Sequence, residues 1–126
     1  MAANKTIRFG PVALTTTLTT NILNCGVTSL AGPVGITVTQ PYLLLKHIRI
    51  VNKTASAATF SLWLGLTGAN TAGTEVIGTA LSVPANFAFD WYSPTGLRMD
   101  AADFLVGGSA SATALTFEAE GEIGLV

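Results

Sequence analysis

The sequence predicts an all-β fold, an antiparallel β-sandwich or jelly roll of about eight strands. Three observations lead to this prediction. Helical periodicity is nearly absent from the 126 residues. Segments in which apolar and polar residues alternate recur roughly every ten residues, a spacing typical of sandwich strands. Clusters of Gly, Pro, Asn and Ser separate these segments, and such clusters favour turns.

The first third of the chain contains three predicted strands. Residues 6–9 form a short strand, which we expect to end at the turn residues Gly10 and Pro11. Residues 12–22 alternate apolar side chains with threonines, so they indicate a strand with one buried face and one hydroxyl-rich face. Residues 34–39 repeat the alternation and predict a third strand.

Residues 42–52 have the strongest strand pattern in the chain. Their first half is apolar on both faces, whereas Ile48 and Ile50 in the second half alternate with His47 and Arg49. Such a segment is typical of a sandwich strand that is covered on both sides at one end.

Residues 58–66 predict the next strand, after a polar turn. The apolar residues at its even positions face inward, and Trp63 is expected to face outward. The short connection predicts that this strand forms a hairpin with residues 42–52. Residues 67–74 are small and lack apolar anchors, so we expect an exposed loop there.

The C-terminal half continues the pattern with shorter segments. Its last strand places Glu118, Glu120 and Glu122 on one outward face, where like charges favour an exposed sheet edge. The predicted strands are residues 75–83, 87–92, 97–99, 104–106 and 113–121, and the predicted turns are residues 84–86, 93–96 and 107–111.

Charged residues are scarce in this chain. They make up 10% of it, against about 25% in typical soluble domains, and the formal net charge is −1. A surface of hydroxyls and small apolar groups protects weakly against association. We therefore expect a protomer whose surface is largely covered by neighbouring subunits; the alternative is a free domain with a neutral surface. Six basic residues are balanced by seven acidic ones, so no nucleic-acid partner is expected.

No arrangement of residues in the sequence predicts catalysis. Cys25 is the single cysteine and His47 the single histidine, so no intrachain disulfide can form, and a catalytic pair of the two is a minor alternative. Asp100 and Asp103 are expected to cap a turn, with a Ca²⁺ site as the alternative. We predict no enzymatic activity, no catalytic residue, no cofactor and no metal site.

The N-terminal residues lack the apolar core of a signal peptide. No apolar stretch reaches the roughly 18 residues of a membrane span. We therefore expect synthesis in a cytoplasm, no export by a standard signal, and no membrane partner.

Three aromatic residues are candidates for an interaction surface. Trp63, Trp91 and Tyr92 are of the type that anchors protein interfaces, and an outward Trp on a threonine-rich face indicates such an anchor. The alternative is a sugar-stacking platform formed by the same three rings, which would make the chain a carbohydrate-binding module.

The order of segments from about residue 42 to residue 122 resembles a known family. The segments that carry the resemblance are residues 46–54, residues 59–64, Val83-Pro84-Ala85-Asn86, Leu97-Arg98-Met99, residues 104–108 and Glu120-Gly121-Glu122. In this order they resemble small β-sandwich virion proteins of tailed bacteriophages, above all capsid decoration (cement) proteins.

The resemblance implies a virion structural protein without catalytic residues. Such proteins form homotrimers, bind the major capsid protein on the outside of an assembled phage head, and stabilise that head. The resemblance also implies an N-terminal arm, residues 1–11, whose Lys5 and Arg8 contact the capsid, followed by a single sandwich domain, residues 12–126. The expected location is the capsid surface of the virion, and the structural alternative is a tail, neck or head-fibre component.

Overall fold

The computed structural model describes residues 5–24, 42–65, 74–100, 103–111 and 113–124. These residues form eight strands and no helix, which confirms the predicted all-β class. Within the same residues, accordingly, no helix has the length and apolar character of a membrane span. The strands are β1 (Lys5–Ala13), β2 (Asn21–Asn24), β3 (Tyr42–Asn52), β4 (Ala58–Gly65), β5 (Leu81–Val83), β6 (Ala88–Met99), β7 (Phe104–Ser109) and β8 (Leu115–Gly124).

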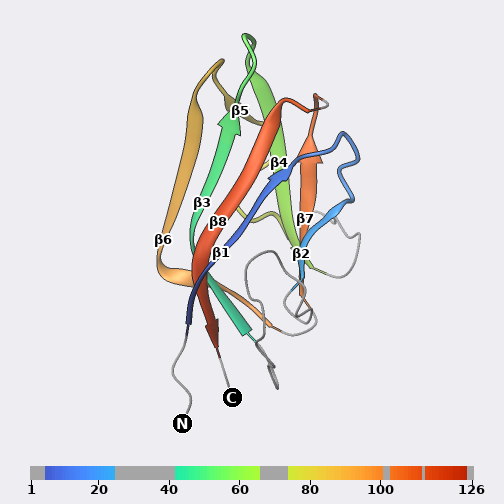
Figure 1. Ribbon diagram of the computed structural model, residues 1–126. Coiled ribbons are helices and arrows are strands. Elements are labelled where there is room, and N and C mark those ends of the chain that lie inside the picture. The colour runs from blue at the N-terminus through green and yellow to red at the C-terminus, as the bar shows by residue number, and fades with distance from the viewer. Residues whose placement is uncertain (1–4, 25–41, 66–73, 101–102, 112, 125–126) are drawn as a thin grey trace.

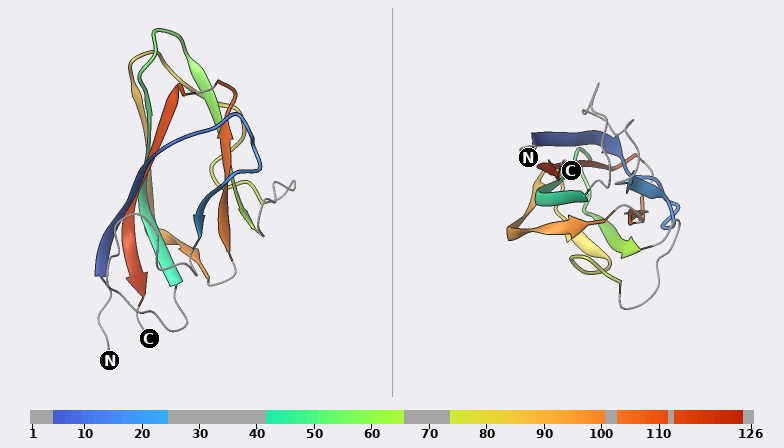
Figure 2. Two further views of the ribbon diagram at one scale, coloured as in Figure 1. Left: turned by 45° about the vertical axis from the view of Figure 1, so that its right-hand side comes forward. Right: turned by 90° about the horizontal axis from the view of Figure 1, so that it is seen from below.

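The strands form two antiparallel sheets that pack face to face, with the orders β1-β8-β3-β6 and β2-β7-β4-β5 (Figure 1). Their pairing is nested: β1 pairs with β8, β2 with β7, β3 with β6, and β4 with β5. The chain is therefore one long hairpin that reverses between β4 and β5. The pairs β3–β8 and β4–β7 roll this hairpin into two layers, which Figure 2 shows from the side. This arrangement is the predicted jelly roll.

The hydrophobic core fills the space between the two sheets. Phe9 and Phe117 enter it from the β1-β8-β3-β6 sheet, and Phe60 and Leu62 enter it from the other sheet, all essentially without solvent exposure. The ring of Phe60 meets that of Phe89 edge-on, with the ring centres 5.2 Å apart. Alternate residues of each layer thus build the core, as the period of a β-strand requires.

Strand β3 reverses its side-chain parity within its own length. Leu43 and Leu45 are buried at odd positions, whereas Ile48 and Ile50 are buried at even positions. The pairing of β3 with both neighbours shifts between Leu45 and His47, so one extra residue, Lys46, is inserted there. This β-bulge keeps both apolar pairs facing the core. The first half of β3 was expected to be covered on both faces. Its Leu43 and Leu45 face the core, and Tyr42 and Leu44 on the other face are half-buried, so the cover of that outer face is partial.

The predicted hairpin between residues 42–52 and 58–66 is wrong. These segments form β3 and β4 as expected, but the two strands lie in different sheets. The connection between them carries the chain from one layer to the other. The predicted turn at residues 93–96 is also wrong, because it lies inside β6. Leu45 pairs with Leu97 and His47 pairs with Tyr92, so residues 93–96 bulge out opposite Lys46 alone.

Gly10 and Pro11 do not end the first strand. β1 continues through them to Ala13, with a register shift between Phe9 and Val12. The segment predicted as an N-terminal arm, residues 1–11, therefore belongs to an edge strand of the sheet from Lys5 onward.

The strand predicted for residues 12–22 does not form over most of its length. Residues 14–20 make a turn in which the hydroxyl of Thr20 donates to the carbonyl oxygen of Thr17 at 2.7 Å. Threonine hydroxyls compete in this way with the hydrogen bonds of a sheet. The strand predicted for residues 34–39 lies outside the described residues, as does the loop predicted for residues 67–74 except for Thr74.

The glycines of residues 107–111 do not form the predicted turn. β7 continues to Ser109, and a Cβ at Gly107 would lie 2.1 Å from the carbonyl oxygen of Ser61 on β4. Glycine is needed there because the two backbones approach closely. The last predicted strand is confirmed as β8, but β8 lies between β1 and β3, so its glutamates do not occupy a sheet edge.

Candidate functional site

Most charged side chains of the described residues gather on one surface, the outer face of the β1-β8-β3-β6 sheet. We call this surface the charged face. It forms because the inward positions of these strands are apolar, so the alternate positions carry the polar residues. Its charged members are Arg8, Lys46, Arg49, Asp90, Arg98, Glu118, Glu120 and Glu122.

Charges of opposite sign face one another across neighbouring strands of this surface. Glu118 on β8 pairs in register with Arg49 on β3, which in turn pairs with Asp90 on β6. One step along the sheet, Glu120 stands between Arg8 on β1 and His47 on β3. Cross-strand pairs of opposite charge stabilise a sheet modestly, so the charged face is largely compensated within itself.

Asp90 is the centre of a hydrogen-bonded group on the charged face. Arg49 Nε donates to Asp90 Oδ1 at 2.8 Å, and His47 Nε2 lies 2.7 Å from the same oxygen. The hydrogen bond from Arg49, followed by that of His47, holds the pKa of Asp90 below its ordinary value of 3.8. The same carboxylate raises the pKa of Arg49. Because an ionised carboxylate can only accept, the His47 Nε2 contact requires that nitrogen to carry a proton.

His47 also holds the ring of Tyr92. The two rings lie parallel, with centres 4.4 Å apart and an interplanar angle of 8°. Tyr92 is 67% exposed, so its ring would otherwise be free to move through several rotamers. The chain of contacts from Arg49 through Asp90 to His47 thereby orders an exposed aromatic side chain.

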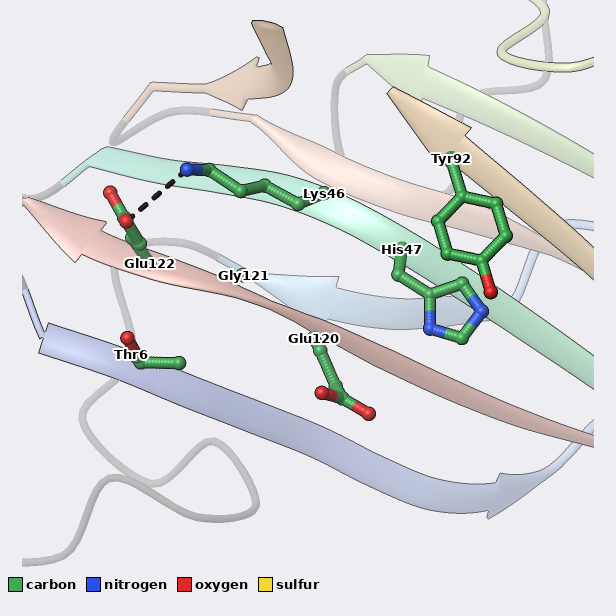
Figure 3. Close-up of a pocket in the computed structure, with 7 residues that line it drawn as sticks. All are labelled: Thr6, Lys46, His47, Tyr92, Glu120, Gly121 and Glu122. Carbon is green, nitrogen blue, oxygen red and sulfur yellow. Dashed lines mark hydrogen bonds and ion pairs between the residues drawn. The ribbon is translucent and has the colours of Figure 1, made fainter. Parts of the chain in front are cut away.

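A pocket of about 290 Å³ lies on the charged face beside this stacked pair. Figure 3 shows Glu120, Gly121 and Glu122 following one another along β8 beneath it, with Lys46 and His47 on β3. The lining residues are Thr6, Lys46, His47, Tyr92, Glu120, Gly121 and Glu122.

The bulge at Lys46 shapes this pocket. Lys46 Nζ reaches Glu122 Oε1 at 3.2 Å and closes one end of the pocket. Gly121 allows β8 to approach the bulge, because a Cβ at this position would lie 1.9 Å from the carbonyl oxygen of Leu44. The pocket therefore depends on one extra residue in β3 and one missing side chain in β8.

The five predicted interface residues are spread over the molecule. Arg8 and Tyr92 lie exposed on the charged face, and Lys5 pairs in register with Ile123 in the same sheet. Trp91 is on the opposite side of β6 and packs partly buried against the core. The expected exposure of Trp63 is wrong: it lies outside the core cluster yet is only 7% exposed, beside its β7 partner Val106. The three rings therefore form no common platform for a sugar.

Sequence reasoning did not find the group of Lys46, His47, Arg49, Asp90 and Glu120. The alternation of residues 46–49 and 118–122 predicts which of their side chains point outward. It does not reveal that β8, β3 and β6 are neighbours, and that order brings the group together.

The predicted capping role of Asp103 is confirmed. Its Oδ2 accepts a hydrogen bond from the backbone N–H of Asp100 at 2.8 Å, and Asp103 N donates to the carbonyl oxygen of Asp100. Asp100 Oδ1 accepts from Arg98 Nε at 2.8 Å. In the part of the chain that the structure describes, no group of three or more His, Cys, Asp or Glu residues is placed to hold a metal ion.

Comparisons of the chain with protein-family models, with curated proteins and with solved structures find no match.

Proposed function

We propose that this chain is a structural protein of a bacteriophage virion, a capsid decoration protein that binds the outside of an assembled head as a trimer and stabilises it. The observation that carries the proposal is an almost uncharged end of the sandwich. We call it the loop end, and it consists of the described residues of four connections, residues 14–20, 53–57, 84–87 and 110–114 without residue 112.

The nested topology places these four connections at one end of the sandwich, the upper end in Figure 1. Backbone hydrogen bonds tie them together: Asn86 N donates to Thr54 O at 3.0 Å, and Lys53 N donates to Ala114 O at 3.3 Å. Lys53 is the sole charged residue among the described residues of the loop end.

The loop end also exposes apolar side chains. Phe87 is 66% exposed and Leu18 is 38% exposed. An exposed phenylalanine among uncharged, small residues favours association with another protein surface. Such a surface suits a subunit that is covered by neighbours, because free proteins rely on charge to remain apart.

The sheet edges favour contact through loops and faces over addition of a strand. In the β1-β8-β3-β6 sheet, the edge strands β1 and β6 contain Pro11 and Pro94 and both are bulged. In the other sheet, the edge strands β2 and β5 have four and three residues. Proline, bulges and short length all discourage edge-to-edge pairing. Jelly rolls are common in capsid domains, which adds a fold-level analogy to the resemblance in strand order.

Co-sedimentation of the purified chain with decoration-free heads of its phage tests the proposal. We expect the chain to sediment with intact heads, and light scattering to give the mass of a trimer. The variant Phe87→Asp should lose head binding. Tyr92→Asp is the matched control, because it changes an equally exposed aromatic residue on the charged face.

Two results would overturn this function. A chain that remains monomeric and does not sediment with heads is not a decoration protein. Electron microscopy that places the labelled chain on the tail, neck or head fibre assigns it to that part of the virion instead.

A further inference from the structure

We infer that the pocket beside His47 and Tyr92 is a binding site for one neutral sugar unit of a glycan. The inference does not rest on the proposed function, because it uses the charged face and not the loop end. Four features of the pocket carry it: an ordered aromatic wall, an available carboxylate, an ammonium group with spare donors, and a balance of charge.

The aromatic wall is formed by the stacked rings of His47 and Tyr92. Their parallel arrangement at 4.4 Å and the hydrogen bond from His47 to Asp90 fix both rings before a ligand arrives. A sugar ring has an apolar C–H face that packs against aromatic rings, and tyrosine and histidine combine such a face with a polar edge. Because the wall is already ordered, binding loses little side-chain entropy there.

Glu120 supplies the carboxylate. Its side chain is exposed at the pocket, and no hydrogen bond or ion pair joins that carboxylate to another described residue. A carboxylate with both oxygens available can accept hydrogen bonds from two neighbouring hydroxyls of a sugar. Its register neighbours Arg8 and His47 lie on either side of it.

Lys46 supplies hydrogen-bond donors at the other end of the pocket. An ammonium group has three N–H donors, and the contact with Glu122 occupies one of them. The remaining donors can reach sugar hydroxyl oxygens. Thr6 on β1 adds a hydroxyl at the pocket margin.

The balance of charge favours a neutral ligand. A phosphate or an acidic sugar would meet Glu120 and Glu122, and a lysine or arginine side chain from a partner would meet Lys46 and Arg8. A polyol uses donors and acceptors equally and meets no like charge. The volume of about 290 Å³ is at the small end of ligand sites, which suits one sugar unit.

NMR titration of the ¹⁵N-labelled chain tests the site directly. The probes are methyl α-D-glucopyranoside, methyl α-D-galactopyranoside and N-acetyl-D-glucosamine, each followed at the backbone amides. We expect at least one of them to shift the signals of Glu120, Gly121 and His47 in a saturable manner. D-glucuronate and Nα-acetyl-arginine amide are the charged comparison ligands, and we expect no saturable shift from either.

Two variants sharpen the test, one of them with a matched control. Glu120→Gln should raise the Kd for the bound sugar about tenfold, because hydrogen bonds to a charged group are among the stronger ones. Glu118→Gln makes the same change on the same face of β8 outside the pocket and should leave the Kd unchanged. Tyr92→Ala should weaken binding without affecting sedimentation with heads.

The inference is overturned if none of the three neutral sugars shifts the pocket signals. It is also overturned if Glu118→Gln weakens binding as much as Glu120→Gln, or if glucuronate or the arginine derivative binds more tightly than the neutral sugars. If the wild-type chain binds a sugar but does not sediment with heads, the proposed function is refuted and the sugar site is not.

Discussion

The imidazole of His47 lies flat against the phenol of Tyr92, at an interplanar angle of 8°, although the two residues come from segments that the sequence separates by more than forty positions. The pairing of β3 with β6 brings them together. Asp90 links His47 to the guanidinium of Arg49 through hydrogen bonds, so this network orders the exposed ring of Tyr92.

The carboxylate of Asp90 predicts a specific acid dependence. Its pKa in the folded chain is lowered from 3.8 by Arg49 and then by His47, so it stabilises the fold while it is ionised. This stabilisation is complete above the pKa of the unfolded chain and is lost as the pH falls through the lower, folded pKa. Urea unfolding of the wild type and of Asp90→Asn should therefore differ most at neutral pH. The two curves should converge below pH 3.8, and a difference that grows on acidification would contradict the assignment.

Gly121 predicts a large effect from a single methyl group. In Gly121→Ala the new Cβ would lie 1.9 Å from the carbonyl oxygen of Leu44, so β8 and β3 must separate. We expect a loss of about 3 kcal/mol in the free energy of unfolding, the upper part of the range for overpacking. Glu118→Ala on the same strand should change it by less than about 0.5 kcal/mol. Denaturant titration measures the free energy of unfolding of both variants. Equal losses in the two would contradict the close approach of β8 and β3 at Gly121.

The buried side chain of Asn52 predicts how much stability is lost when its hydrogen bonds are removed. Its side chain is buried, with Nδ2 donating to the carbonyl oxygens of Ser56 at 2.8 Å and Val83 at 3.0 Å. Its Oδ1 accepts from the backbone N–H of Thr54 at 2.9 Å and from the Thr54 hydroxyl at 2.7 Å. Asn52→Ala leaves these groups unpaired and should cost about 2–3 kcal/mol in thermal or urea unfolding. Lys53→Ala, the exposed neighbour, should be nearly neutral, and comparable losses in the two variants would contradict the prediction.

Trp63 predicts a stability effect where the sequence indicated an interface. Because it is 7% exposed, Trp63→Ala should lower the free energy of unfolding by about 3 kcal/mol or more. Phe87→Ala, which removes a ring that is 66% exposed, should change it by less than about 0.5 kcal/mol. Unfolding is measured on the isolated chain at low concentration. A larger loss of unfolding free energy in Phe87→Ala than in Trp63→Ala would contradict the burial of Trp63.

The sequence predicted where the strands lie in the chain better than it predicted which strands pair in a sheet. Alternation is a local signal, so β3, β4 and β8 were found with nearly their observed bounds, and the glutamates of β8 were placed on the correct face. Sheet membership is not local. The polar connection at residues 53–57 reads equally well as a hairpin turn and as the crossing between two layers that it is.

The candidate site could not be predicted from the sequence for the same reason. Lys46 is an ordinary residue in the sequence, and its role appears only when both neighbours of β3 are seen to shift register at that position. The turn residues around Pro94 were misread because turn chemistry also serves a bulge inside a long strand. Trp63 was misread because the alternation separates the two faces of a strand but does not say whether the second face is covered.

The nested pairing has a consequence for how the chain reaches its structure. Translation delivers β1 long before its partner β8, and β2 and β3 likewise emerge before β7 and β6. The pair β4–β5 closes across the shortest stretch of chain, so folding is expected to start there and to proceed outward in both directions. β1, the first strand to be synthesised, is thus the last to pair with its partner. Until β8 has left the ribosome, the incomplete chain exposes unpaired strand edges, which are prone to aggregation.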